Sequence, residues 1–196
     1  MSSRIQAQNT RVRISALMAM GVGLILVGTA LAAVVIGNNN AGGAAAFVGS
    51  GSVVPAKVEF RAPALYLPNL SGRAESWQDY AGRLILVNNW ATWCPPCKAE
   101  MPTLQAYYDE HVAEGLTVIA IEAGSPAAEV KQFARSYHLT FPIWVDTETA
   151  ALEAFKNASL PNSCVIDRSG IVRLAWVGEI DREALEKHVT PLLSEQ

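Results

Sequence analysis

Two cysteines, Cys94 and Cys97, stand close together in the segment Trp90-Ala91-Thr92-Trp93-Cys94-Pro95-Pro96-Cys97. A C-x-x-C pair between a strand pattern and a helix pattern is typical of a redox dithiol. At the helix N-terminus, free N–H groups and the positive end of the helix dipole would stabilise a thiolate on Cys94. We therefore expect Cys94, at an exposed helix end, to be the attacking sulfur, and Cys97, one turn later, to close a disulfide with it.

Metal binding and a structural disulfide are the alternatives to redox chemistry. Half a zinc site would need a second pair of ligands, and neither Cys164 nor the three histidines (His111, His138 and His188) stand at ligand spacing. A Cu(I) site formed by both thiolates is chemically reasonable. A structural disulfide that closes so small a loop between tryptophans would stabilise little. The redox interpretation is favoured, and it requires no cofactor or metal besides the Cys94–Cys97 disulfide. Cys164 is expected in the core.

Alternating strand and helix patterns surround the motif and predict a three-layer α/β domain. Strands are predicted over 64–67, 83–87, 117–121 and 143–145, followed by a terminal hairpin over 165–166 and 171–177. A helix is predicted over 95–114, interrupted by Pro102, and a short one over 149–155. Two more helices are predicted to begin at N-cap residues: one runs from Ser125 to about residue 137 and the other from Asp181 to about residue 193. Because a terminal hairpin is antiparallel, the sheet must be mixed.

The N-terminal region reads as a membrane anchor. Residues 1–13 carry three arginines and no acid, and residues 14–36 are uncharged and almost all apolar. Twenty-three such residues suffice to cross a hydrocarbon core of about 30 Å. A cleaved signal peptide ending near Ala30-Leu31-Ala32 is the alternative, although its apolar region would usually be about 7–15 residues long. Because positive charge flanks the span only on its N-terminal side, the N-terminus is predicted to be cytoplasmic and the body to lie outside the cytoplasm.

The chain is therefore expected to comprise a cytoplasmic tail (1–13), a single transmembrane anchor (14–36), a flexible linker (37–57) and the α/β domain (58–196). The linker is small, polar and nearly uncharged, as flexible linkers are. From residue 57 onward there are 12 Lys and Arg against 18 Asp and Glu. This acidic body has no basic stripe, so nucleic acid is not an expected partner.

Over residues 62–193 the sequence resembles the thioredoxin superfamily, and more narrowly its membrane-tethered TlpA/ResA-type thiol–disulfide oxidoreductases. The resemblance is carried by the run LILVNNWATWCPPCKAEMP (84–102) and by LPNSCVID (160–167). The second run departs from the family pattern x-P-T-T-F-x-I-D at Asn162, Ser163 and Cys164. Substrate contacts at those positions are therefore in doubt.

The resemblance assigns Pro161 to the family's cis-proline, which lies against the dithiol and leaves the backbone of Leu160 free to pair with an extended substrate. An ordinary trans proline is the alternative. Trp93 is predicted to form a partly exposed wall of the substrate site, whereas Trp90 is predicted to be core.

Glu100 matches an acidic residue that this branch keeps three positions after the second cysteine. A buried carboxylate on the same helix face could receive the Cys97 proton; a solvated helical glutamate is the alternative. Asn88 stands where ordinary thioredoxins carry a buried aspartate, which makes Glu100 the more plausible base.

We therefore expect a membrane-anchored protein disulfide reductase that works outside the cytoplasm. Cys94 would attack a substrate disulfide and Cys97 would resolve the mixed disulfide. Pro96 stands where strong oxidants of the superfamily have histidine. The resemblance implies a transmembrane thiol donor of the CcdA/DsbD kind and apocytochrome c as a client. The alternative function is a Cu(I)-handling module for metalloenzyme assembly. A peroxide-reducing enzyme would need a P-x-x-x-T-x-x-C segment, which the sequence lacks.

Overall fold

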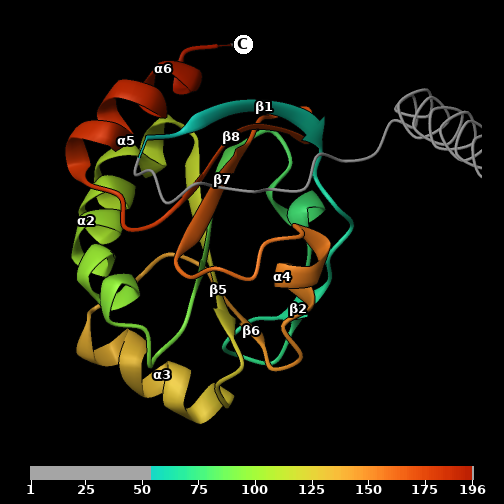
Figure 1. Cartoon of the computed structure of the whole chain (residues 1–196), viewed down its shortest axis with the longest axis vertical. Coiled ribbons are helices and arrows are strands. Elements are labelled where there is room, and N and C mark those ends of the chain that lie inside the picture. The colour runs from blue at the N-terminus through green and yellow to red at the C-terminus, as the bar shows by residue number, and fades with distance from the viewer. Residues whose placement is uncertain (1–53, 196) are drawn as a thin grey trace, which may run out of the picture. The chain divides into compact units, whose positions relative to one another are not determined.

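A six-stranded mixed sheet organises the domain in a computed structural model that describes residues 54–195. The predicted tail and anchor, and the linker up to residue 53, lie outside the described residues. The strands follow the order β1-β8-β7-β4-β5-β6 (Figure 1). They span Ala56–Arg61 (β1), Leu84–Trp90 (β4), Leu116–Ala123 (β5), Ile143–Asp146 (β6), Asn162–Ile166 (β7) and Ile171–Val177 (β8). β4, β5 and β6 are parallel, whereas β7 is antiparallel to β4 and β8, so the prediction of a mixed sheet is confirmed.

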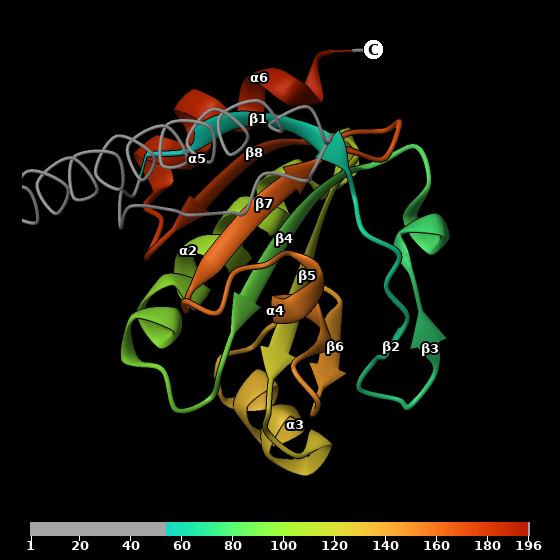
Figure 2. The same cartoon turned by 45° about the vertical axis from the view of Figure 1, so that its right-hand side comes forward.

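Helices cover both faces of the sheet and complete the three layers (Figures 1 and 2). One face carries α2 (Pro95–His111), α3 (Ala127–Ser136) and α5 (Arg182–His188), while α4 (Ala150–Ala154) packs on the other face. That other face also carries the short 3-10 helix η1 (Trp77–Tyr80) and is flanked by the small hairpin of β2 (Leu67–Pro68) and β3 (Ala74–Glu75). The remaining turns of helix are η2 (Val112–Glu114) and α6 (Thr190–Leu193).

Two apolar clusters fill the spaces between the layers. Every residue of β4 and β5 is buried, and successive side chains of a strand point to opposite faces of a sheet. Leu86 therefore joins the cluster under α2 and α3, which also holds Cys94 and Cys97. Its neighbour Val87 joins the cluster under α4, which also holds Cys164. The uninterrupted apolar runs of these strands follow from burial on both faces.

The N-terminal boundary differs from the prediction. Only Leu67 of the predicted strand 64–67 is in a strand, and the edge strand β1 over 56–61 was not predicted. The side chains of β1 alternate between exposed and half-buried, so charged residues such as Glu59 interrupt its apolar pattern. Because β1 begins at Ala56, the last two residues of the predicted linker belong to the domain.

The helix on the C-terminal side of the motif is more regular than expected, and it ends at His111, where the turn η2 follows. α2 runs without a break through Pro102, whose missing N–H removes one backbone hydrogen bond. Burial of Met101, Leu104 and Tyr107 on the sheet holds the helix together across this point.

Two predicted helix ends are also different. The N-cap of α3 is Pro126 rather than Ser125, because the Ser125 hydroxyl is hydrogen-bonded to Thr92 instead. The predicted last helix is divided into α5 and α6, since Pro191 cannot donate the backbone bond that would continue it. The Asp181 cap is confirmed.

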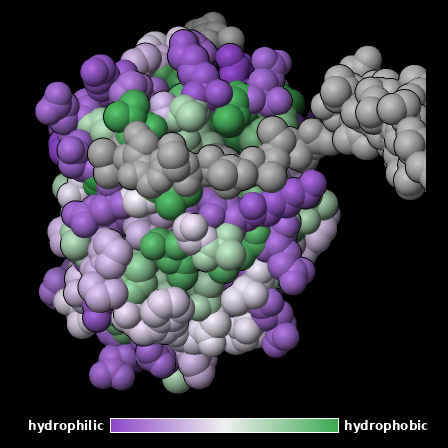
Figure 3. All heavy atoms as spheres, in the orientation of Figure 1, coloured by the Kyte–Doolittle hydropathy of each residue, from purple (hydrophilic) through white to green (hydrophobic). Residues whose placement is uncertain are grey.

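The described surface is largely polar around the margin of the face shown in Figure 3, with apolar residues gathered towards its middle. Among residues 54–195 the exposed large hydrophobic side chains are Val54, Tyr66 and Trp93. No helix within this range is long and apolar enough to cross a membrane, and the predicted span 14–36 lies outside it.

Candidate active site

Cys94 and Cys97 form a disulfide at the start of α2, with Cα atoms 5.3 Å apart. Cys94 is the N-cap residue, and its Sγ accepts a hydrogen bond from the Cys97 N–H at 3.4 Å. Pro95 and Pro96 fill the first helical turn, where a missing N–H removes no intrahelical bond. The helix end predicted for Cys94 is therefore present, and its N–H groups would stabilise a Cys94 thiolate after reduction.

Cys94 is less accessible than the sequence predicted. In the disulfide form 4% of Cys94 is exposed and none of Cys97, because both sulfurs belong to the apolar cluster under α2. The order of exposure agrees with the predicted roles, but the expectation of an exposed Cys94 is wrong for this form.

The two tryptophans of the motif have different surroundings. Trp93, next to Cys94, is 67% exposed, whereas Trp90 is fully buried and lies 4.7 Å from the Phe133 ring. A large exposed indole beside a reactive sulfur is available for contact with a protein substrate. Both placements agree with the sequence-based interpretation.

Glu100 is completely buried one turn beyond Cys97. Its Oε1 accepts a hydrogen bond from Asn88 Nδ2 at 2.8 Å, and its Oε2 accepts one from the Ile180 N–H at 3.1 Å. Asn88 Nδ2 also donates to Ser163 Oγ at 3.0 Å. The solvated alternative for Glu100 is therefore excluded. The carboxyl group joins α2 to strand β4 and to the segment between β8 and α5, and Asn88 extends the network to β7.

Burial raises the pKa of Glu100 from its ordinary 4.5 to about 7, and the nearby charge of Glu179 acts in the same direction. The hydrogen bonds from Asn88 and Ile180 oppose this shift without cancelling it. A carboxyl group with a pKa near neutrality can both take up and release a proton at physiological pH.

The Leu160–Pro161 peptide bond is cis, as the resemblance implied. Leu160 is half-buried against the cluster that contains both cysteines, and it lies just before the paired residues of β7. The Pro161 carbonyl accepts a hydrogen bond from the Gly178 N–H at 2.8 Å. The Leu160–Pro161 segment therefore lies at the start of β7, beside the cluster that contains both cysteines.

Asn162, one of the departures from the family pattern, has a structural task that sequence reasoning missed. Its Oδ1 accepts a bond from Asn89 Nδ2 at 2.8 Å, and its Nδ2 donates to the Ser159 carbonyl at 2.7 Å. Asn89 and Asn162 are paired in register across β4 and β7. The sequence signal that could have indicated this contact is the pair Asn88-Asn89 in the otherwise apolar strand β4.

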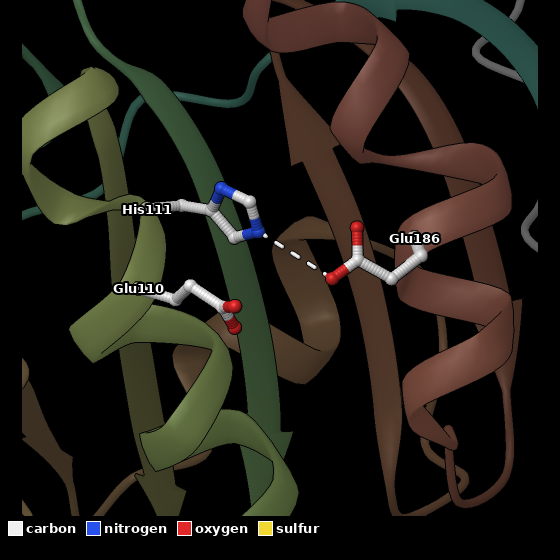
Figure 4. A group of neighbouring side chains, drawn as sticks. All are labelled: Glu110, His111 and Glu186. Carbon is white, nitrogen blue, oxygen red and sulfur yellow. Dashed lines mark ion pairs between the residues drawn. The ribbon is translucent and has the colours of Figure 1, made fainter.

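The three histidines have no ligand spacing in the sequence, yet His111 at the end of α2 lies beside two glutamates (Figure 4). His111 is 7% exposed, and its Nε2 points to Glu186 of α5 at 3.5 Å. The Arg182 guanidinium pairs with both Glu110 and Glu186. Because Arg182 already pairs with both carboxylates, the group links α2 to α5.

Cys164 is buried in the cluster on the opposite side of the sheet, where burial raises the pKa of its thiol. The prediction of a core cysteine is confirmed. Within the described part of the chain, the one convergent group of metal-ligating side chains is that of His111, and it includes no cysteine. A Cu(I) site would have to rest on the thiolates of Cys94 and Cys97 alone among these residues.

Comparison with known proteins agrees with this geometry. The sequence profile of the AhpC/TSA family matches residues 58–175. The chain is 34% identical over 128 residues to the thiol-disulfide oxidoreductase ResA of Geobacillus kaustophilus, which covers 65% of this chain and 74% of that protein. It is 35% identical over 130 residues to the thioredoxin-like protein YneN of Bacillus subtilis, covering 65% and 75%. A crystal structure of a putative thiol:disulfide interchange protein DsbE from Chlorobium tepidum superposes with a TM-score of 0.66 at 27% identity, covering 71% of this chain and 99% of that one.

Proposed function

The chain belongs to the AhpC/TSA family and is a thiol–disulfide oxidoreductase of the ResA-like kind, and on that premise we propose that it reduces protein disulfides outside the cytoplasm. The observation that carries the proposal is the disulfide at the start of α2 with a buried carboxylate, Glu100, one turn beyond it. That arrangement supplies a nucleophile, a resolving thiol and a base on one helix.

In the reducing direction the Cys94 thiolate attacks one sulfur of a client disulfide. A Cys94–client mixed disulfide forms, and the other client sulfur leaves as a thiolate that takes up a proton. Cys97 then gives its proton to Glu100 and attacks Cys94 Sγ, which releases the second client thiolate. The client gains two electrons, and the protein is left with the Cys94–Cys97 disulfide.

The reducing direction has support from the residues around the dithiol. A buried carboxylate near the thiols disfavours their ionisation, and reduced dithiols with poorly stabilised thiolates are better reductants. Pro96 adds no positive charge to stabilise a thiolate, in contrast to a histidine at that position. We propose no cofactor other than the disulfide itself.

The setting proposed for this reaction is the outer side of a membrane. The three arginines before residues 14–36 support a single-pass anchor with a cytoplasmic N-terminus. A domain held there is oxidised by each turnover, so it needs a thiol donor that carries electrons across the membrane. We propose a transmembrane protein of the CcdA/DsbD kind as donor and apocytochrome c as a client, both on the strength of the family resemblance.

The test is the redox equilibrium of the full chain in detergent, measured against dithiothreitol and glutathione buffers. A reductase should have a midpoint well below that of the glutathione couple and should reduce insulin with dithiothreitol as donor, while Cys94→Ser should not. A midpoint at or above the glutathione couple would instead identify an oxidant. Cu(I) titration of the reduced protein and of Cys94→Ser distinguishes the copper alternative from the redox function. The copper alternative requires that the reduced wild type binds Cu(I) tightly and that Cys94→Ser loses this binding.

A further inference from the structure

A second carboxylate, Glu122, is buried behind the loop that leads to Cys94. Glu122 is fully buried near the end of β5, paired in register with Trp90 at the end of β4. Val118 and Ala120 precede it at alternate positions and face the cluster that contains both cysteines. By the alternation of a strand, Glu122 points to the same side of the sheet as the dithiol.

Hydrogen bonds tie this carboxylate to the loop between β4 and α2. Glu122 Oε1 accepts a bond from the Thr92 N–H at 3.3 Å, and Oε2 accepts one from the Ser125 N–H at 2.8 Å. The Thr92 and Ser125 hydroxyls lie 2.8 Å apart, and Thr92 also donates to Glu129. The loop preceding α2 is thereby joined to the loop preceding α3.

One residue, Trp93, separates Thr92 from Cys94, and the turn is closed by a bond from the Cys94 N–H to the Ala91 carbonyl at 3.1 Å. A shift of Thr92 would therefore move the reactive sulfur. Both carboxylate oxygens of Glu122 thus accept hydrogen bonds from backbone N–H groups, as the oxygens of a negatively charged side chain can. Within residues 54–195 no ion pair compensates that charge.

From this geometry we infer that Glu122 is a positioning residue that fixes the turn before Cys94 and, by its buried negative charge, disfavours the Cys94 thiolate. Glu122 then keeps the dithiol strongly reducing, because any charge that destabilises the thiolate of the reduced form favours the disulfide. This inference rests on the proposed function and extends it to a residue outside the C-x-x-C motif. It differs from the role of Glu100, which lies beyond Cys97 on α2 and receives a proton.

The test compares Glu122→Gln with the wild-type full chain. Glutamine keeps the length of the side chain and removes the charge, so the reduced Cys94 should titrate at a lower pH. Rapid alkylation by iodoacetamide at pH 6 should become up to about tenfold faster, the size of one pKa unit. The equilibrium constant for oxidation of the dithiol by glutathione should fall by a similar factor. Should Glu122→Gln not fold, Glu122→Met, which also lacks the charge, replaces it.

Matched variants separate the charge from the loop contacts. Thr92→Val removes the hydroxyl bonds to Ser125 and Glu129 but keeps the Thr92 N–H and the charge of Glu122. It should leave the Cys94 titration in place, as should Glu122→Asp, which restores the charge. An unchanged titration in Glu122→Gln, or an equal shift in Thr92→Val, would overturn the inference. Failure of the wild-type protein to exchange disulfides at all would instead count against the proposed function.

Discussion

Replacing Glu100 with glutamine should remove a large pH-dependent loss of stability from the oxidised protein. The pKa of Glu100 is raised from 4.5 to about 7 by burial, so folding opposes its ionisation. Below pH 4.5 the group is neutral in both the folded and the unfolded chain and costs nothing. Between pH 4.5 and about 7 the unfolded chain ionises this group while the folded protein keeps its proton, so the free energy of unfolding falls over this range. Above that range the folded protein buries a charge that the unfolded chain leaves in water, and the loss is complete. The difference between the two pKa values corresponds to about 3 kcal/mol.

Urea unfolding of the oxidised protein at pH 5 and pH 8 measures this effect directly. The wild type should lose about 2.5 kcal/mol more than Glu100→Gln between these two pH values, because a small part of the loss is already present at pH 5. Glu100→Gln should itself be less stable at pH 5 by about 1 kcal/mol, because its amide cannot accept the bonds from both Asn88 and Ile180. Glu153→Gln, at an exposed position on α4, is the matched control and should follow the wild type. Parallel pH profiles for the wild type and Glu100→Gln would refute the reasoning.

The same substitution should slow resolution of the mixed disulfide. With the base removed, Cys97 loses its proton acceptor, and general-base assistance is typically worth about 10²–10⁴-fold. Stopped-flow measurement of client release should show that slowing, together with a lower-pH titration of Cys94, since a negative neighbour has been removed. A change in stability without either kinetic effect would leave Glu100 with a structural role only.

Four further outcomes follow from the active site and the N-terminal charges. Cys97→Ser should trap mixed disulfides with clients on non-reducing gels while Cys94→Ser should trap none, and equal trapping would contradict the assigned roles. In the reduced wild type, Cys94 should be alkylated faster than Cys97, as peptide mapping by mass spectrometry would show. Trp93→Ala should change the free energy of unfolding by less than about 0.5 kcal/mol, since the indole is 67% exposed, but should lower kcat/KM for protein disulfides more than for small disulfides. Alkaline phosphatase fused after Gln196 should be active in cells; an inactive fusion beside an active cytoplasmic reporter would reverse the proposed topology.

The parts of the fold that were predicted correctly are those whose signals are local. Strands β4 and β5 carry uninterrupted apolar runs, and the C-x-x-C motif with its two prolines marks the start of α2. Strand β1 was missed because an edge strand buries only part of its surface, so residues such as Lys57 and Glu59 are tolerated there.

The contacts that complete the site depend on residues far apart in the chain. Ser125 has the local pattern of an N-cap, but its hydroxyl is hydrogen-bonded to Thr92, in the loop that follows the neighbouring parallel strand. Glu122 stands at the end of an apolar run, and only the parallel pairing of β4 with β5 brings it behind the loop before Cys94. The burial of Glu100 depends likewise on strand pairing, which sets Asn88 beside Ser163 and close enough to bond the carboxylate. Periodicity within one segment contains no information on such pairings.

The sheet that separates the two apolar clusters also determines which cysteines can form a disulfide with each other. Cys164 lies on the α4 side, paired in register with Val87, whereas Cys94 and Cys97 lie on the α2 side. Of the three disulfides that Cys94, Cys97 and Cys164 could form, the folded domain can thus form only Cys94–Cys97 without breaking its central strands. Repeated cycles of oxidation and reduction of the folded domain therefore return to the same disulfide.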